Sequence, residues 1–582
     1  MDDKNTFHVG ITMAGAVSAG AFSAGFMDYL LEVLGLWEEQ KTIIRNKLDS
    51  GVELSDFEKK IPLHNVCIDA IGGASAGGMV GVITALSTFS KMEPVKEPSD
   101  TRTGNMLYDS WVLLDDDEKG GETFIKMLQT DDIETTLTSL LNSTPIDRIA
   151  DRVFHGFTQK AIIWHPPTYI SRDLRVLVTL CSLRGIPFEL NFENFISSHF
   201  PHSPGHRMNE HMIVAHFKLS YNEKEDRDIY LNFDPCDKEA RELLKLCTKA
   251  TGAFPIGLAP RHFKGKLSKE YIKNCMLRNL PINEKDAIVV HLQEEYFDFT
   301  DVDGGTINNE PYSEVVQTLE DMNPPYNSKL PMFGTIMIDP FPNFYNQDEP
   351  LGAGETTSGL KFQGTIWEVI PKLYGTLRQQ VKVKHSGSFY KDYFRLLVFP
   401  IKWESVGKLS SHPPLSCAAL GGFGGFLNVE FRKHDFFLGR NNARNFLRAF
   451  FMLEYDENEK HPLFENLSQE AIQAFRRKIG KNIYCPIIPD INYLYDKEKG
   501  DTNPFKYTVE DFPLLPAGYF KKIEPHLRNR INKMIAHEIN ARLGKKGILR
   551  RTAKLFKNYV AKRITRTVIN FMQDDLKKRK ML

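Results

Sequence analysis

The chain is 582 residues long, and with 42% hydrophobic and 25% charged residues it has the composition of a folded globular protein rather than a disordered one. Its formal net charge is zero, which gives no indication of a nucleic acid partner. The charge is unevenly distributed, because residues 541–582 contain 14 Lys+Arg against 2 Asp+Glu, a net charge of +12, which leaves −12 on the rest of the chain.

The N-terminal segment is predicted to form a β-loop-α unit. Residues 8–13 are an apolar run typical of a buried strand, and residues 22–34 place apolar side chains at helical spacing. The loop between them, residues 15–20, consists of small residues. Residues 10–27 are free of charge but contain four glycines, so we expect a buried strand and loop there rather than a membrane span.

A second strand-turn-helix unit follows. Its turn reads Gly73-Ala74-Ser75-Ala76-Gly77, between an apolar run and a segment that suits a helix. The pattern G-x-S-x-G in this context is a nucleophile elbow, in which the serine lies on a strained turn and small residues on either side let strand and helix approach closely. Ser75 is therefore predicted to be a nucleophile, with Gly73 and Gly77 shaping the elbow. An ordinary small-residue turn is the alternative.

These alternating units predict an α/β fold with a mostly parallel sheet covered by helices on both faces. Residues 91–172 are polar and acidic, and we interpret them as an insertion of short helices that shapes a lid and pocket. The glycine-rich loop 352–359 marks a boundary between a domain over residues 7–343 and a mainly helical region over residues 360–582.

A hydrolytic serine needs a base for its proton and donors for the oxyanion. The turn Asp303-Gly304-Gly305 follows an apolar strand and places a carboxylate where Asp303 could accept that proton directly. The first loop runs from a strand into a helix, so the backbone N–H groups of Gly15, Ala16 and Val17 are predicted to form the oxyanion hole.

Together, these motifs resemble those of the patatin-like phospholipase family, and of its large bacterial members in particular. That family combines a glycine-rich loop after the first strand, a G-x-S-x-G elbow, and a D-G-G or D-G-A turn far downstream; Ser75 and Asp303 match its catalytic dyad. The resemblance covers residues 7–342 apart from the insertion, and it includes the Phe-Pro stretch at residues 250–260. It implies a three-layer α/β/α lipid acyl hydrolase that cleaves fatty-acyl esters through an acyl-enzyme, without a metal or organic cofactor.

The first loop departs from the family pattern. Where the family usually shows G-G-G-x-R-G, this chain has Gly15-Ala16-Val17-Ser18-Ala19-Gly20, and a β-branched residue such as Val17 disfavours positive φ. Two alternatives stay open. One is an α/β-hydrolase with a Ser-Asp-His triad that recruits His385 or His412, although several strands normally precede the serine in that fold. The other is a non-catalytic lipid-binding scaffold.

A second, weaker resemblance lies downstream, in Phe423-Gly424-Gly425-Phe426 and the charged residues that follow it. It is similar to a segment of large bacterial patatin-related proteins, and we expect it to support the core. Arg432, Asp435 and Arg440 are predicted to form a buried ion network there.

The C-terminal helix suggests a partner. Its apolar residues recur at helical spacing, and its basic residues lie largely elsewhere around the helix; the apolar set is Leu555, Phe556, Tyr559, Val560, Ile564, Val568, Ile569 and Met572. The helix could lie on an anionic membrane surface, which suits a phospholipid or other acyl-lipid substrate, or it could dock on the acidic body.

The seven cysteines are scattered and form no C-x-x-C pair, which argues against a disulfide framework or zinc knuckle and favours a reducing compartment. We expect a cytoplasmic protein, peripherally attached to the inner membrane surface if the basic helix binds lipid.

Overall fold

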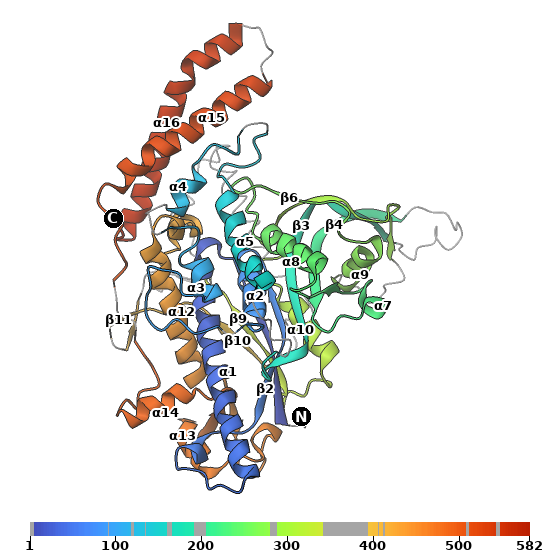
Figure 1. Ribbon diagram of the computed structural model, residues 1–582, viewed down its shortest axis with the longest axis vertical. Helices are drawn as coiled ribbons and strands as arrows, with labels where there is room; N and C mark the ends of the chain where they lie inside the picture. The colour runs from blue at the N-terminus through green and yellow to red at the C-terminus, as the bar shows by residue number, and fades with distance from the viewer. Residues whose placement is uncertain are drawn as a thin grey trace, which may run out of the picture.

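The computed structural model describes most of the chain: residues 5–90, 92–117, 122–133, 136–159, 166–190, 205–279, 288–341, 394–405, 407–410, 414–507, 511–542 and 548–582. The described residues form a large twisted sheet with helices on both faces (Figure 1). Its strands are β1 (Thr6–Met13), β2 (Asn65–Gly73), β3 (Ile170–Leu190), β4 (His206–Lys218), β5 (Leu231–Asn232), β6 (Arg261–Phe263), β7 (Ile288–Val290), β8 (Phe299–Asp303), β9 (Phe333–Ile338) and β10 (Arg395–Val398).

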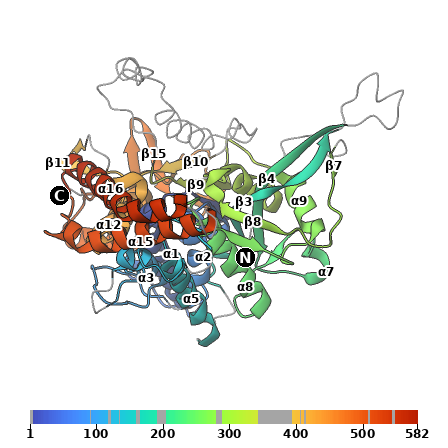
Figure 2. The same cartoon turned by 90° about the horizontal axis from the view of Figure 1, so that it is seen from above.

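The sheet is mostly parallel at its centre, as the sequence predicted. Its order is β10-β9-β1-β2-β3-β4-β5, and all pairs from β10 to β3 are parallel. β4 pairs antiparallel with β3, and the two form a ribbon that points away from helices α12 (Val429–Ala449) and α16 (Ile548–Lys578) (Figure 2). Phe7, Val9, Ile11 and Met13 of β1 are almost completely buried on one face of the sheet, and Thr12 is 0% exposed on the other, which is typical of a strand covered on both faces.

The helices begin with α1 (Gly20–Asp49), α2 (Ala76–Ser87), α3 (Met106–Trp111), α4 (Thr123–Met127), α5 (Thr144–Gln159), α7 (Glu223–Asp226), α8 (Lys238–Thr251), α9 (Lys269–Asn279) and α10 (Tyr312–Met322). Two adjacent residues of β2 show that helices cover both faces of the sheet. The side chain of Ile71 lies against Gly81 of α2, whereas a Cβ atom on Gly72 would lie 2.4 Å from Val315 of α10. Neighbouring residues of a strand point to opposite faces, so the predicted α/β/α fold is confirmed.

Helix α1 lies in the interior. Among the described residues, only the stretch Val17–Asp49 is long and apolar enough to cross a membrane, but 83% of its most apolar window is buried inside the protein. The helix packs lengthwise against α12 (Val429–Ala449) (Figure 1). Its apolar composition is therefore explained by its position in the core.

The C-terminal region shares the core of the N-terminal domain. Strand β10 extends the central sheet, and one continuous hydrophobic cluster includes residues of both regions. The predicted boundary at residues 352–359 lies outside the described residues. The region is mainly helical, as expected, and also contains short strands; its other elements are β11 (Trp403–Ser405), β12 (Lys408–Leu409), β13 (Met452–Tyr455), α13 (Gln469–Phe475), β14 (Arg477–Ile479), β15 (Asn482–Pro486), α14 (Ile491–Glu498), α15 (Tyr519–Arg542) and α16 (Ile548–Lys578).

Candidate active site

Ser75 lies on the sharp turn between β2 and α2. Its backbone has φ 51° and ψ −127°, a conformation that costs a non-glycine residue on the order of 1–3 kcal/mol. The turn is possible because its neighbours have no side chains: a Cβ atom on Gly73 would lie 2.4 Å from the backbone of Gly77, and one on Gly77 would lie 2.2 Å from the carbonyl oxygen of Met13. The sequence pattern therefore produces the strained elbow that it predicted.

The structure brings Ser75 and Asp303 together across 228 positions of the chain. The hydroxyl of Ser75 donates a hydrogen bond to Oδ2 of Asp303 at 2.6 Å, and the two residues are only 7% and 4% exposed. Asp303 ends β8, and its other oxygen accepts a hydrogen bond from the backbone N–H of Gly305 at 2.7 Å. Gly304 and Gly305 open the short 3-10 helix η5 (Gly304–Thr306). This geometry suits direct proton transfer from serine to carboxylate.

The end of α8 and the residues that follow it position both Ser75 and Asp303. Thr251, which is fully buried, accepts a hydrogen bond on its hydroxyl from the backbone N–H of Ser75 at 2.8 Å. Two residues later, the carbonyl of Ala253 accepts the backbone N–H of Asp303 at 2.9 Å. The sequence identified residues 250–260 only as a stretch of family-like composition, and no pattern in it singled out Thr251.

The first loop passes beside Ser75, but its predicted donors are not equivalent. The N–H of Gly15 donates to the carbonyl of Asn309 at 3.2 Å, and the side-chain amide of Asn309 donates back to the carbonyl of Gly15 at 3.4 Å. Because the N–H of Gly15 already donates to Asn309, we exclude it as an oxyanion donor. Of the three predicted donors, Ala16 and Val17 remain.

Val17 adopts the conformation that its residue type disfavours. Its φ is 50°, in the left-handed region where a β-branched residue is an outlier. The patatin-like pattern has its third glycine at this position, and Val17 adopts a backbone conformation that favours glycine. Val17 also lines a cavity together with Ser75 and Asp303.

That cavity is small, about 60 Å³, and its walls are almost entirely apolar. Parts of the chain that are far apart in sequence supply these walls. Residues of α2, of the insertion, of the stretch after α8 and of a C-terminal segment contribute: Met79, Ile83, Trp111, Leu114, Ile146, Ile149, Phe254, Leu258, Phe423 and Phe426. The insertion thus shapes the pocket as expected, whereas Phe423 and Phe426 were expected only to support the core.

The C-terminal segment contacts the first loop directly. The hydroxyl of Ser18 donates to the carbonyl of Gly422 at 2.5 Å and accepts the backbone N–H of Gly425 at 3.0 Å. On its other side, the segment is tied to α16, because the N–H of Leu420 donates to Oδ2 of Asp575 at 2.8 Å. The segment comprises the 3-10 helices η8 (Ala419–Gly422) and η9 (Gly424–Phe426).

Arg432 joins this segment to the insertion. Its guanidinium is 1% exposed, donates to the carbonyls of Val112 and Gly425 at 2.5 Å each, and forms an ion pair with Asp116. The expected ion network of Arg432, Asp435 and Arg440 is not a single network. Asp435 accepts hydrogen bonds from the backbone N–H groups of Ser416 and Cys417, and Arg440 forms ion pairs with Asp28 and Glu32 of α1. The three residues therefore contact three different parts of the chain.

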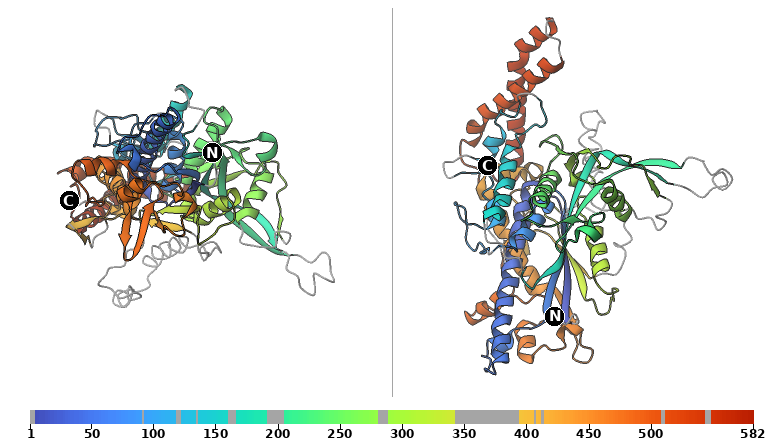
Figure 3. Two further views of the ribbon diagram at one scale, coloured as in Figure 1. Left: turned by 90° about the horizontal axis from the view of Figure 1, so that it is seen from below. Right: turned by 45° about the vertical axis from the view of Figure 1, so that its right-hand side comes forward.

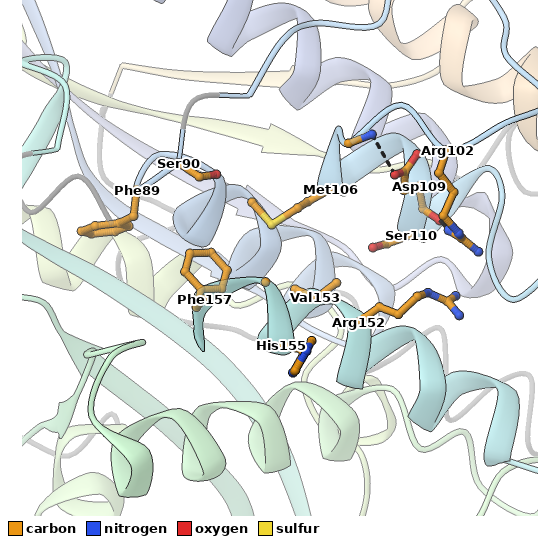
Figure 4. Close-up of a pocket in the computed structure, with 12 residues that line it drawn as sticks. Phe89, Ser90, Arg102, Met106, Asp109, Ser110, Arg152, Val153, His155 and Phe157 are labelled. Atoms are coloured by element: carbon orange, nitrogen blue, oxygen red, sulfur yellow. Dashed lines mark hydrogen bonds between the residues drawn. The ribbon is translucent and has the colours of Figure 1, made fainter. Parts of the chain in front are cut away.

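A second cavity of about 310 Å³ lies between the end of α2, α3 and α5 (Figure 4). Its apolar lining is Phe89, Met106, Val153 and Phe157. Ser110 lines this cavity and the cavity at Ser75, so the two spaces are neighbours. Arg152 also lines it and is paired with Asp115 at 2.8 Å.

Asp301 is a buried carboxyl two residues before Asp303 and on the same side of β8. The side chain of Asp301 is 0% exposed. Burial raises the pKa of Asp301 well above its ordinary value, and the negative charge of Asp303 adds to this effect. We therefore treat Asp301 as neutral.

One group of described residues could hold a metal ion: ligand atoms of His8, Cys67 and Asp69 all lie within 4.8 Å of one another. His8 pairs with Cys67 in the register of β1 and β2, five residues before β1 ends beside the elbow. Nδ1 of His8 lies 2.7 Å from Asp69, which also accepts a hydrogen bond from Asn323, so the arrangement is explained without a metal. The candidate triad histidines, His385 and His412, lie outside the described residues.

No known family model matches this chain. The chain is similar to a protein of Sinorhizobium fredii (strain NBRC 101917 / NGR234) that bears the name "Uncharacterized protein y4iI", with 28% identity over 541 residues, or 84% of this chain and 71% of that protein. That name states no activity, so the functional argument rests on the geometry of the site.

Proposed function

We propose that this protein is a serine acyl hydrolase of the patatin-like phospholipase type, which cleaves fatty-acyl esters through Ser75 and Asp303. The observation that carries the proposal is the 2.6 Å hydrogen bond between these buried side chains, on a strained elbow that opens into an apolar cavity. A nucleophile within hydrogen-bonding distance of its base is the recurring arrangement of enzymes that form covalent acyl intermediates.

In the proposed reaction, Asp303 accepts the hydroxyl proton as Oγ of Ser75 attacks the ester carbonyl carbon, and the carbonyl electron pair moves onto the oxygen. Backbone N–H groups of Ala16 and Val17 stabilise this oxyanion. The intermediate collapses, the alcohol leaves with the proton from Asp303, and the acyl group stays on Ser75. Water then attacks the acyl carbonyl carbon while Asp303 takes its proton. The second intermediate collapses, Asp303 returns the proton to Oγ of Ser75, and the fatty acid is released.

The apolar walls favour a substrate with a long acyl chain over a polar ester. The cavity at Ser75 is too small for more than the reacting end of a lipid, whereas the neighbouring cavity is about five times larger and also has apolar walls. We place the acyl chain there, past Ser110, and expect phospholipids or lysophospholipids as substrates.

The decisive experiment combines covalent labelling with product analysis. A fluorophosphonate probe should label the wild-type protein and not Ser75→Ala, and a phospholipid panel should release fatty acids only with the wild-type protein. Asp303→Asn should lose at least about 100-fold in kcat, because general acid–base catalysis contributes on the order of 100- to 10000-fold. Ser87→Ala, which removes another buried serine hydroxyl of the same helix, is the matched control and should be labelled and active.

The same experiment separates the alternatives. If Ser75 of a folded protein resists labelling and no fatty acid is released, the non-catalytic lipid-binding scaffold is favoured. If Asp303→Asn keeps full activity while His385→Ala or His412→Ala loses it, the Ser-Asp-His triad replaces the dyad.

A further inference from the structure

Helix α16 has two opposite faces, and one of them is an exposed apolar surface. At 100° per residue, five exposed apolar residues fall within an arc of about 140°. We call this surface the α16 apolar face; its residues and their exposed fractions are Phe556 (60%), Tyr559 (65%), Val560 (40%), Ile564 (41%) and Phe571 (65%). Among residues 556–578 of the helix, the buried ones lie on the opposite side: Ala561, Thr565, Met572 and Leu576.

The apolar residues predicted for α16 therefore fall into two groups, one buried and one exposed. Met572 is buried, and Val568 and Ile569 are partly buried against the hydrophobic core, so one side of the helix is docked. Phe556 and its neighbours remain exposed, so docking does not account for the whole apolar pattern. An exposed cluster of large apolar side chains marks a binding surface more often than isolated exposed residues do.

Basic residues border the α16 apolar face. By the same helical geometry, Lys557 and Arg566 lie at its two edges and Arg563 lies within it. None of these side chains forms an ion pair with the described part of the chain, and the segment 541–582 carries a net charge of +12. Long basic side chains can lay their aliphatic stems along an apolar surface and keep the charged group outside it.

The face lies on an element that projects from the molecule. Helices α15 and α16 pack together as a hairpin that extends beyond the rest of the molecule (Figures 1 and 3). The base of the hairpin is fixed by the hydrogen bond from Leu420 to Asp575 and by one from the N–H of Leu515 to the carbonyl of Met581 at 2.9 Å. The hairpin is also joined to the insertion by the ion pair of Arg530 with Asp132.

We propose that the α16 apolar face binds the surface of an anionic lipid bilayer. The partner must accept exposed aromatic and aliphatic side chains and be negatively charged, and a leaflet with anionic headgroups offers both. A second copy of this chain would bring an equally basic hairpin to the contact, so charge repulsion disfavours a dimer through this face. The proposal goes beyond ester hydrolysis and does not depend on it.

The test is co-sedimentation of the full-length protein with vesicles. The wild-type protein should bind vesicles of phosphatidylcholine mixed with phosphatidylglycerol, should bind pure phosphatidylcholine vesicles far more weakly, and should be released by salt. Replacing the three exposed aromatic residues (Phe556→Ser, Tyr559→Ser and Phe571→Ser) should weaken partitioning at least about tenfold, because the buried apolar area is lost. Arg563→Glu with Arg566→Glu should abolish the preference for the anionic vesicles.

A matched control lies on β14, which follows α13 at the opposite end of the molecule (Figure 1). Ile479 is 60% exposed, as Phe556 is, and Lys478 beside it is exposed, so Ile479→Ser with Lys478→Glu should bind vesicles like the wild-type protein. Ser75→Ala should also bind normally, which separates a failure of this proposal from a failure of the proposed catalysis.

Two results would overturn the proposal. One is that the aromatic variant, with its helix content intact by circular dichroism, sediments with anionic vesicles as the wild-type protein does. The other is that the wild-type protein ignores vesicles and is a dimer by light scattering, while the same variant is a monomer, which would assign the face to a second copy of the chain.

Discussion

Two parts of the candidate site are built in different ways. The dyad turns, which carry Ser75 and Asp303, are held by backbone contacts at positions where any side chain would clash. The apolar wall above them, which includes Trp111, Phe423 and Phe426, is assembled from side chains of the insertion and the C-terminal region. The proposed chemistry thus depends on short local motifs, whereas the shape of the space around Ser75 depends on segments distant in sequence.

This difference has a functional consequence. The dyad turns allow little variation, because a shift of about 1 Å at the reacting atoms can cost on the order of 100-fold in rate. The apolar wall can vary in residue type as long as its volume and polarity are kept. We therefore expect substitutions in the turns to abolish activity, and substitutions in the wall to change stability or substrate preference.

The largest effect is expected in the elbow. Gly77→Ala would place a Cβ atom 2.2 Å from the carbonyl oxygen of Met13, and a backbone group cannot move aside as a flexible side chain can. We expect a loss of about 3 kcal/mol or more in the free energy of unfolding by urea, and at least about 100-fold lower esterase activity. Gly35→Ala in α1, where the nearest atom is 3.9 Å away, should instead be neutral or stabilising by up to about 1 kcal/mol. If Gly77→Ala and Gly35→Ala had the same stability and activity, the elbow would not be the tightly constrained region that we describe.

The second-largest effect is expected at Arg432, which joins the C-terminal part of the apolar wall to the insertion. Arg432→Ala leaves Asp116 and two carbonyl groups without their buried partner, so we expect about 3 kcal/mol lower stability in urea unfolding. Arg542→Ala breaks an ion pair between side chains that are 81% and 40% exposed, and it should change stability by less than about 1 kcal/mol. A loss at Arg432 no greater than that at Arg542 would mean that the wall is held by apolar packing alone.

A pH effect is expected beneath the dyad. In the unfolded chain Asp301 titrates near its ordinary pKa of about 3.9, whereas burial raises the pKa of Asp301 in the folded protein. At a pH between the pKa of the unfolded chain and that of the folded protein, Asp301 is protonated in the folded protein and ionised in the unfolded chain. The contribution of Asp301 to stability is therefore full below the unfolded pKa, and it is lost as pH rises from the unfolded pKa through the folded pKa. Asparagine does not titrate. As pH rises, the free energy of unfolding of the wild-type protein should therefore fall relative to that of Asp301→Asn by up to about 1.4 kcal/mol per pH unit.

Urea unfolding at several pH values between pH 5 and 8 measures this difference. The exposed carboxylate of Asp49 provides the control, because Asp49→Asn should differ from the wild-type protein by an amount that changes little with pH. A flat difference for Asp301→Asn would show that Asp301 is ionised in the folded protein.

The smallest effect is expected in the second cavity. Val153 is 6% exposed on its wall, so Val153→Trp should fill part of the space next to Ser110. We expect kcat/KM for a long-chain p-nitrophenyl ester to fall about tenfold relative to that for a short-chain ester, because pocket contacts with methylene groups are worth about 1–3 kcal/mol. Ile256→Trp, at a 74% exposed position, should leave the ratio unchanged. If the ratio also stays unchanged in Val153→Trp, the acyl chain lies elsewhere.

The sequence by itself was enough to predict the parallel α/β core, the elbow around Ser75 and the turn at Asp303. These features depend on local rules: buried apolar runs form strands, and small residues permit sharp turns. The pairing of Ser75 with Asp303 was predicted from the resemblance of the two motifs to one family's catalytic dyad. Strand direction did not predict it, because β2 runs parallel to β3 whereas β8 runs antiparallel to it.

Tertiary structure alone decided which groups surround that pair. Thr251 carries no local signal for its contact with Ser75, and the N–H of Gly15 is engaged only because Asn309 folds beside it. Phe423 reaches the cavity through contacts between Ser18 and the C-terminal segment, and no spacing in the sequence encodes them. The same holds for α16, because helical periodicity shows that a helix has an apolar stripe, but only packing determines which side is buried and which side is exposed.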